Sequence, residues 1–536
     1  MKEYCLFVFI LFFLSMGLDQ WQKKIQKKRK QTSWRDFVME IASWMPVNFY
    51  KIGHNVSRFP DTSRAGQLVS VQEHPQQDVV EWGMVWSFFD SYTRLFRKSP
   101  KMIIQQWFEN ENSIYAECYG AKDCYLSFGV WQNAENVLYT MMSHSTITNI
   151  INSFSIVWGC DNIYSSRCIT NSYNVFFSSN VHNSNNVWFS SNMLGCNDCI
   201  ACSNLENMSY CIENKSYSKE EYSKLRNSFL QEKNRYDDYH YIAYRSDIDN
   251  KISTNVHGKW IVHSKDIENG FFVQNLVGWR NIFLWWWQYS GSNFYDSFDV
   301  WNQEDSHLYA TNYVGENSSH VYCVIWWAQL NNVYYSYHME SCSFCLWCIW
   351  LKNKQYCIFN KQYSKEERYS KVDEIFGQMD KDGVLGEFFP ASMNPFYFND
   401  TAAYLIDPSF TKEEVTAKAY LRRDEPVKVD IPEGVDVVKV NELSNYEGFV
   451  ILTEVEGSHQ QMRFLDSATL HSKWHEEVKR TIDPNILKKI IIDEKGNYYK
   501  IMKMEYDFLM KYWLPLPRKH WLDRMKENFK LDYQVL

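Results

Sequence analysis

The chain has 536 residues, with 56 Lys and Arg against 64 Asp and Glu, and a formal net charge of −8 at pH 7. This balance excludes a general nucleic-acid-binding surface, because neutralising phosphates needs a basic face. A chain of this length is expected to contain several domains.

The N-terminal segment carries an apolar run followed by a basic cluster. Cys5 to Met16 contain no charged side chain, but the run is shorter than the roughly 20 residues of a membrane-spanning helix. A secretory signal has its basic residues before the apolar run. Here they come after it, as Lys23, Lys24, Lys27, Lys28, Arg29 and Lys30. We expect a solvated basic tail, with a weak membrane anchor through Cys5 to Met16 as the alternative and the cytoplasm as the slightly favoured compartment.

From residue 151 onward an apolar residue recurs every six positions. A period of six does not fit a helix of 3.6 residues per turn. It is typical of a β-solenoid, in which each rung has a large and a small inward residue. The large residues are Ile151, Val157, Ile163, Ile169, Val175, Val181, Val187, Met193, Cys199, Leu205 and Cys211. The small ones, three positions later, are Cys160, Ser166, Ser172, Ser178, Ser184, Ser190, Cys196 and Cys202.

The length of one coil follows from a longer repeat. The string from Asn174 to Asn180 recurs, with one change, from Asn186 to Asn192. Twelve residues therefore make one predicted coil, a flat tube similar to the small β-helix of insect antifreeze proteins. An 18-residue, three-sided coil is the alternative. The Asn before most ladder positions is expected at a bend, where it tolerates left-handed backbone.

The same pattern occurs twice, 146 residues apart. Residues 195–202 align with 341–348, and residues 211–221 align with 357–367. Each copy ends on a Ser followed three residues later by a Glu, which predicts a capping box and a helix that closes the solenoid. These pairs are Ser218 with Glu221 and Ser364 with Glu367.

Beyond residue 380 the composition changes. Alternating Val and Ile predict strands between Asp430 and Glu456, Thr411 to Glu414 offers another helix start, and helices are predicted at Trp474–Arg480 and Asp507–Tyr512. The predicted fold class is mainly β: two tandem β-solenoid copies with helical caps, plus a small α+β C-terminal region. The predicted domains are residues 1–100, 101–235, 236–380 and 381–536.

Two cysteine clusters have the two-residue spacing of zinc and iron–sulfur ligands. Inward positions fall on every third residue, so cysteines that fill consecutive inward positions must show this spacing without any metal. Packing is therefore the favoured interpretation, with no metal or other cofactor, and zinc is the alternative. The candidate ligands for that alternative are Cys196, Cys199, Cys202, Cys211, Cys342, Cys345, Cys348 and Cys357.

Enzymatic motifs are scarce, and no catalytic residue is predicted. Asp296, Asp299 and Glu304 could line a solenoid groove, as in carbohydrate-cleaving β-helices, but nothing fixes their separation. The histidines at 144, 182, 307, 320 and 338 fall at unrelated phases of the ladder. No phosphate-binding Gly loop, nucleophile elbow or His-Glu-x-x-His motif is present.

Three strings carry a resemblance that covers the chain from about Tyr115 onward: residues 348–367, Gly386 to Pro390, and Leu514 to Arg518. They resemble an uncharacterised cysteine-rich family of candidate-phylum bacteria, with zinc-ribbon-like knuckles and an occasional automatic label of CaiB/BaiF. The resemblance implies no established activity. In its C-terminal knuckle the family has cysteines where this chain has Ile492, Lys495, His520 and Asp523, which implies a degenerate knuckle without zinc.

Tryptophan is unusually abundant, with 22 Trp against 20 Gly. The resembled family carries Gly where this chain has Trp347 and Trp350, and the first copy has Ala201 and Asn204 at the same positions. We hypothesise that such Trp codons are UGA, read as glycine in some of these bacteria. Outward aromatic contacts are the alternative.

The function predicted from these patterns is a non-enzymatic β-solenoid scaffold that binds a protein or glycan partner. A metal-binding or redox protein that uses the cysteine clusters is the first alternative. An enzyme, such as a CoA-transferase or a carbohydrate-active β-helix enzyme, is the weaker one.

Overall fold

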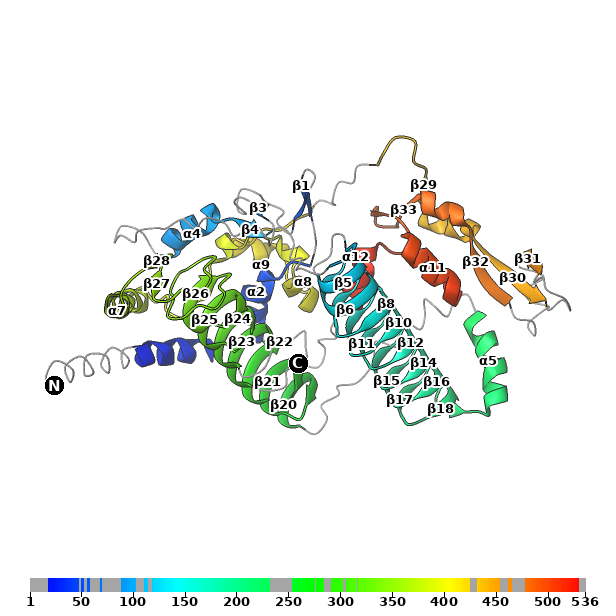
Figure 1. Ribbon diagram of the computed structural model, residues 1–536, viewed down its shortest axis with the longest axis horizontal. Coiled ribbons are helices and arrows are strands. Elements are labelled where there is room, and N and C mark those ends of the chain that lie inside the picture. Colours follow the sequence, from blue (N-terminus) through cyan, green and yellow to red (C-terminus); the bar gives the residue numbers. More distant parts are fainter. Residues whose placement is uncertain are drawn as a thin grey trace. The chain divides into compact units, whose positions relative to one another are not determined.

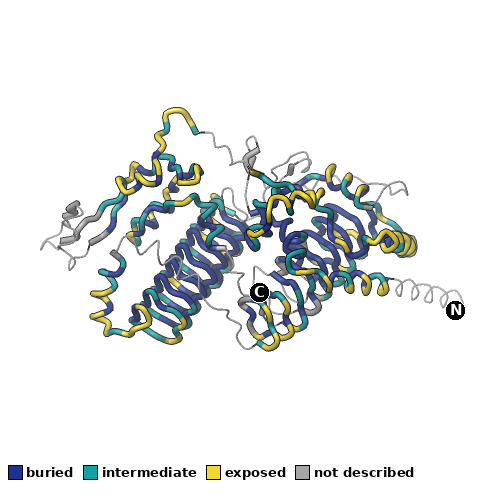
Figure 2. The backbone as a smooth tube through the Cα atoms, turned by 180° about the vertical axis from the view of Figure 1, so that it is seen from behind, coloured by how far each residue is buried: buried dark blue, intermediate teal, exposed yellow. Residues whose placement is uncertain are grey.

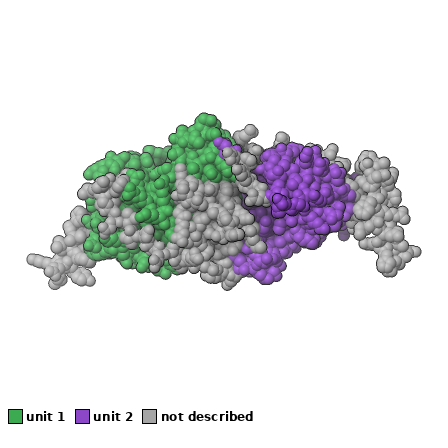
Figure 3. Space-filling model, turned by 90° about the horizontal axis from the view of Figure 1, so that it is seen from above, with its two compact units in different colours: residues 1–105, 248–423, 531–536 green, residues 106–247, 424–530 purple. Residues whose placement is uncertain are grey.

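The computed structural model describes residues 18–47, 50–52, 55–57, 68–69, 88–102, 110–113, 118–231, 253–274, 276–283, 291–301, 305–315, 317–424, 431–453, 461–464 and 478–529. The chain forms two compact units (Figure 3). Unit 1 comprises residues 1–105, 248–423 and 531–536, and unit 2 comprises residues 106–247 and 424–530. Each unit contains one β-solenoid. The predicted four-domain division stays a prediction.

The first solenoid, in unit 2, stacks short parallel strands in two rows (Figure 1). The odd-numbered strands from β7 to β17 form one row, and the even-numbered strands from β8 to β18 form the other. Strand β6 pairs with β7 and with β8, the first strands of the two rows. The strands are β5 (Cys118–Tyr125), β6 (Phe128–Leu138), β7 (Met141–His144), β8 (Ile147–Ile151), β9 (Phe154–Val157), β10 (Asp161–Tyr164), β11 (Arg167–Thr170), β12 (Tyr173–Phe176), β13 (Ser179–His182), β14 (Asn185–Trp188), β15 (Ser191–Leu194), β16 (Asn197–Ile200), β17 (Ser203–Glu206), β18 (Ser209–Ile212) and β19 (Lys215–Ser216).

The register confirms a 12-residue coil and excludes the 18-residue alternative. Ile163 pairs with Val175, and Val175 pairs with Val187. Ile163, Val175 and Val187 are fully buried. At the first two rungs the ladder prediction is wrong by one residue: Ile150 and Ile156 are inward, not Ile151 and Val157, because the coil there has thirteen residues and pairs Ile150 with Ile163 and Ile156 with Ile169. In Figure 2 much of the backbone of the stacked coils is coloured as buried. The ladder is therefore the core of the solenoid.

The small inward residues have a role that size alone does not explain. The Ser178 backbone N–H donates to Ser166 Oγ at 3.1 Å, and the same contact recurs one coil later from Ser190 to Ser178 at 3.1 Å. Ser166 Oγ in turn donates to the Tyr164 carbonyl at 2.9 Å. Serine thus satisfies buried backbone groups at the bends, where strand pairing is interrupted.

The second solenoid, in unit 1, has one strand per coil at first and only isolated bridges near its end. Its coils vary in length: Arg280 pairs with Tyr295, fifteen residues on, whereas Tyr322 pairs with Tyr334, twelve residues on. The strands are β20 (Thr254–Val262), β21 (Lys265–Gln274), β22 (Val277–Phe283), β23 (Gly291–Trp301), β24 (Asp305–Gly315), β25 (Ser319–Ala328), β26 (Asn331–Tyr337), β27 (Cys357–Ile358) and β28 (Lys361–Gln362).

Both predicted capping helices are present. Helix α5 (Lys219–Gln231) follows the first solenoid and α7 (Lys365–Lys381) follows the second. Ser364 Oγ accepts the Glu367 N–H, and the Glu367 carboxylate accepts the Ser364 N–H. Ser218 and Glu221 make the same reciprocal pair. The capping boxes are therefore confirmed.

The rest of unit 1 consists of segments from both sides of the second solenoid. Residues 18–29 are helical. The other elements are α2 (Trp34–Glu40), η1 (Ala42–Trp44), β1 (Tyr50–Ile52), β2 (Asn55–Ser57), β3 (Leu68–Val69), α4 (Phe88–Lys98), β4 (Lys101–Met102), η2 (Ala391–Met393), η3 (Phe398–Asp400), α8 (Ala402–Ile406) and α9 (Lys412–Ala417). The predicted helix start at Thr411 is confirmed, because its side chain accepts the Glu414 N–H.

The C-terminal part of unit 2 packs on the first solenoid, where Phe508 stacks on Tyr164 with ring centroids 5.7 Å apart.

Strands within 430–456 are confirmed, and Asp507–Tyr512 lies in helix α11. Lys479 and Arg480 lie in a strand, so the helix predicted at Trp474–Arg480 is wrong there, and 474–477 lie outside the described residues. The elements are β29 (Val437–Lys439), η4 (Val440–Tyr446), β30 (Glu447–Thr453), β31 (Gln461–Phe464), β32 (Val478–Ile482), η5 (Pro484–Lys488), β33 (Ile490–Ile492), β34 (Tyr498–Tyr499), α11 (Lys503–Tyr512) and α12 (Trp521–Phe529).

None of the helices in the described ranges is both long and apolar enough to cross a membrane. The apolar run Cys5 to Met16, which carries the anchor hypothesis, lies outside those ranges.

Candidate functional site

A groove of about 900 Å³ opens on the first coils of the second solenoid. Its walls come from β20, β21, β22 and β23, with Lys30 at one end. The chain packs tightly here, since a Cβ atom on Gly258 would lie 1.8 Å from the Gly270 carbonyl oxygen. The residues that line the groove are Lys30, Asn255, Val256, His257, Gly258, Asp266, Ile267, Glu268, Asn269, Gly278, Trp279, Arg280 and Tyr295.

The groove lies where the helix of residues 18–29 stops covering the solenoid. One outer row of the coils carries stacked tyrosines, with ring centroids 5.1 to 5.2 Å apart. We call these residues the tyrosine row: Tyr295, Tyr309, Tyr322 and Tyr334. Gln22 donates to Tyr334 Oη at 2.6 Å, and Gln26 donates to Tyr322 Oη at 2.9 Å. This helix ends before the row reaches Arg280 and Glu268, and the segment after it contacts that rung: Arg280 Nη1 donates to the Lys30 carbonyl, and Asn281 Nδ2 donates to the Thr32 carbonyl at 2.9 Å.

The groove is polar and its charges balance. Two cationic side chains, Lys30 and Arg280, face two anionic ones, Asp266 and Glu268. Arg280 Nη2 lies 3.3 Å from Glu268 Oε1, and Asn255 Nδ2 donates to Asp266 Oδ1 at 2.7 Å. At the far end, Lys30 Nζ lies 4.7 Å from the centroid of the Tyr295 ring. Such a wall offers both donors and acceptors beside the Trp279 and Tyr295 rings.

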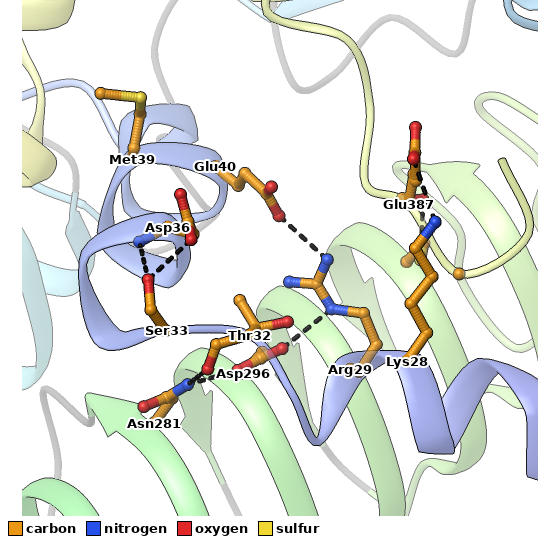
Figure 4. A network of polar contacts seen from close by, with 12 residues as sticks. Lys28, Arg29, Thr32, Ser33, Asp36, Met39, Glu40, Asn281, Asp296 and Glu387 are labelled. Atoms are coloured by element: carbon orange, nitrogen blue, oxygen red, sulfur yellow. Dashed lines mark hydrogen bonds and ion pairs between the residues drawn. The ribbon is translucent and has the colours of Figure 1, made fainter. Parts of the chain in front are cut away.

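A buried network of polar contacts around Arg29 and Asp296 supports the wall of the groove (Figure 4). Arg29 Nε donates to Asp296 Oδ2 at 2.8 Å, and Arg29 Nη1 donates to Glu40 Oε2 at 2.9 Å. Asn281 donates to Asp296 Oδ1 at 2.8 Å and accepts from Asn269, a groove residue, at 2.9 Å. Because the network links Asn269 to two segments of unit 1, it holds that side chain in place.

The carboxylates proposed from the sequence do not form a catalytic pair among the described residues. Asp296 is 0 % exposed and ion-paired with Arg29. Burial raises the pKa of Asp296, although the nearby Arg29 cation acts to lower it. For Arg29 the balance is reversed: burial acts to lower its pKa, but Asp296 and Glu40 raise it. Asp296 therefore supports the wall. The side chain of Asp299 and the whole of Glu304 lie outside the described residues.

One interpretation of the histidines needs correction. His307 and His320 share a phase, because their coil has thirteen residues, and their rings stack with centroids 4.7 Å apart. Burial lowers the pKa of both imidazoles. The fixed six-residue phase used in the sequence analysis does not hold in these longer coils.

The candidate cysteines fill inward positions near the end of each solenoid, and all of them are buried and outside any disulfide in the structure. Cys199 and Cys211 are partners in adjacent strands. Cys345 and Cys357 lie one rung apart, between the bridges Ser343–Gln355 and Leu346–Ile358. Among the described residues, no three His, Cys, Asp or Glu side chains are arranged to hold a metal ion.

The C-terminal knuckle has other contacts at the positions singled out from the sequence. Lys495 Nζ lies 2.8 Å from Asp523 Oδ2, Ile492 ends strand β33, and His520 Nδ1 accepts the Leu522 N–H at 3.2 Å. Tyr499 Oη donates to the Pro517 carbonyl at 2.7 Å. These contacts join the two halves of the knuckle.

Comparison of the chain with family models, curated proteins and solved structures gave no match.

The sequence analysis missed the groove. Its lining residues belong to no motif, and they come together only through the stacking of coils of unequal length. The sequence did contain one signal, because the inward residues of these coils are not spaced by a constant twelve positions. Uneven spacing of this kind indicates coils of different length. The inward residues are Val256, Ile267, Trp279, Phe294 and Leu308.

Proposed function

We propose that the protein is a β-solenoid scaffold that binds an uncharged glycan in the groove of its second solenoid. The single observation that carries this proposal is the groove lining, in which two cationic and two anionic side chains stand beside Asn255, Asn269 and the Tyr295 ring.

The chemistry of the lining favours sugar hydroxyls. A hydroxyl both donates and accepts, so it can use carboxylates, amides and a guanidinium together. An anionic polymer would meet Asp266 and Glu268, and a cationic one would meet Lys30 and Arg280. The groove volume also falls within the range of ligand sites in proteins.

The test measures binding of the full chain to an array of neutral oligosaccharides and compares two variants. Asp266→Ala removes a groove carboxylate. Losing a hydrogen bond to a charged group costs roughly 1.5–3 kcal/mol, and 1.4 kcal/mol is a factor of ten, so we expect binding weaker by about tenfold or more.

Asp161→Ala is the matched control, because Asp161 on the first solenoid makes the same contact across rungs, accepting from Asn149 Nδ2 at 3.0 Å. It should leave binding unchanged. Equal loss in both variants, or no binding to any neutral glycan, would overturn the proposal.

A further inference from the structure

A row of polar side chains leads from the buried cation of Arg29 to the groove. Figure 4 shows its buried members, Arg29, Asp296 and Asn281. Asp296 and Asn281 are both 0 % exposed, whereas Asn269 is half-buried and lines the groove. The three residues lie side by side on neighbouring rungs, because the residues that flank them are paired in register. The row therefore ends on a groove residue whose side chain has a buried partner.

The contacts of Asn281 decide which way its amide points. An amide side chain has one end that donates hydrogen bonds and one end that accepts them. Asn281 Nδ2 donates to the Thr32 carbonyl at 2.9 Å and to Asp296 Oδ1 at 2.8 Å. A backbone carbonyl can only accept, so this end of the amide must be the nitrogen. The other end is therefore the oxygen, which needs a donor.

The amide of Asn269 is oriented by that oxygen. Asn269 Nδ2 donates to Asn281 Oδ1 at 2.9 Å. Turning the Asn269 amide over would place two oxygens against each other and leave a buried acceptor without a donor, which is unfavourable. Asn269 Oδ1 is thus the open end of the row, since no hydrogen bond to it occurs among the described residues.

Asn269 differs in this respect from the two carboxylates of the groove. Asp266 and Glu268 are exposed, and each already has a partner from a neighbouring rung. Asn255 donates to Asp266, and Arg280 is ion-paired with Glu268. Asn269 is held by buried residues, so its acceptor has one orientation before any ligand binds. A preorganised group discriminates between ligands more sharply than a mobile one.

We infer that Asn269 is a specificity-determining residue of the groove, whose Oδ1 accepts a hydrogen bond from one hydroxyl of the bound glycan. This role rests on the proposed function and deepens it, because it fixes the polarity of one contact: the sugar must donate. A derivative with fluorine in place of that hydroxyl cannot donate. The groove should reject such a derivative, because Asn269 Oδ1 is then left unpaired. Asn281 is the positioning residue for this contact.

The test uses the neutral oligosaccharide that binds best on the array, together with derivatives that each carry fluorine in place of one hydroxyl. Titration calorimetry measures their binding to the full chain. We expect one position at which fluorine weakens binding about five- to tenfold, as for one hydrogen bond whose acceptor stays unpaired. Asn269→Ala should bind this derivative and the parent equally, because the acceptor is absent.

Asn174→Ala is the matched control. Asn174 Nδ2 donates to Asn186 Oδ1 at 2.9 Å on the first solenoid, and Asn174 and Asn269 both have a φ of 55°. This variant should leave the fluorine effect unchanged. Asn281→Ala removes the orienting oxygen and should reduce the fluorine effect although Asn269 is still present. An unchanged effect in Asn281→Ala would overturn its positioning role.

The outcomes separate this role from the proposed function. Parent binding that depends on Asp266, with equal fluorine effects in the native chain and in Asn269→Ala, would overturn the role of Asn269 and leave glycan binding standing. Equal binding of the parent and all its derivatives to the native chain would also overturn it, and this measurement needs no variant to fold. If no neutral oligosaccharide binds, the proposed function fails, and the role of Asn269 fails with it.

Discussion

Left-handed backbone at every third residue shapes both solenoids at the scale of single residues. From Asn162 to Glu213, and again from His320 to Phe359, each third residue has a positive φ. The Asn residues before the ladder positions, such as Asn162 and Asn174, occupy many of these positions, which confirms their predicted left-handed backbone. Their predicted place at a bend is wrong, because they lie within strands such as β10 and β12. Phe177 and Phe189 occupy other left-handed positions, and their side chains gave no such signal, because bulky residues rarely adopt this conformation.

Trp347 and Trp350 also have left-handed backbone, with φ of 56° and 57°. A side chain there costs roughly 1–2 kcal/mol, which Gly avoids. In the structure this cost is offset by ring contacts, such as the stack of Trp347 on Tyr335 with centroids 4.7 Å apart.

The hypothesis of UGA codons read as glycine predicts Gly at 347 and 350. Peptide mass spectrometry of the native protein across residues 341–357, read beside the gene's codons, measures this directly. Tryptophan at both positions would refute the hypothesis and leave aromatic packing as their role.

At the scale of elements, helix α12 begins beside an imidazole. Burial lowers the pKa of His520 to about 4. The neutral Nδ1 accepts the Leu522 N–H at the start of the helix, and a positive charge is unfavourable at a helix N-terminus. Protonation would break this cap.

This predicts a pH dependence for unit 2. The folded pKa lies below the ordinary 6.5, so as the pH falls from 6.5 to about 4 the unfolded chain takes up a proton that the folded chain does not. The free energy of unfolding should fall by about 1.4 kcal/mol per pH unit at most, and no further below that range.

Urea unfolding at several pH values, compared with His520→Asn, checks this prediction. Asparagine can still accept a hydrogen bond at the helix start but does not titrate, so the variant should show a flatter profile. Parallel profiles would show that His520 is not the responsible group.

Helix starts and solenoid rungs were predictable because each depends on residues close in sequence. The pairs Ser218–Glu221 and Ser364–Glu367 and the ladder from Ile163 to Val187 are of this kind. The strand at Val478–Ile482 was missed because its pairing with β30 involves residues about thirty positions away.

At the scale of the whole molecule, each solenoid is completed by segments distant in sequence. Residues 18–29 cover Tyr322 and Tyr334 of the second solenoid, and α11 covers Tyr164 and Phe176 of the first. The solenoids were foreseeable from their repeat. These covering segments were not, because an amide such as Gln22 that meets Tyr334 across 312 residues leaves no local pattern. The groove depends on where such a segment ends, so it was equally hidden.

The most direct test of the account is hydrogen exchange of the full chain with and without the neutral oligosaccharide that binds best on the array. Binding in the groove predicts slower exchange in β20, β21 and β22 and around Lys30, with the first solenoid unchanged. Protection confined to the first solenoid, or no protection in the groove under saturating glycan, would contradict the central claim.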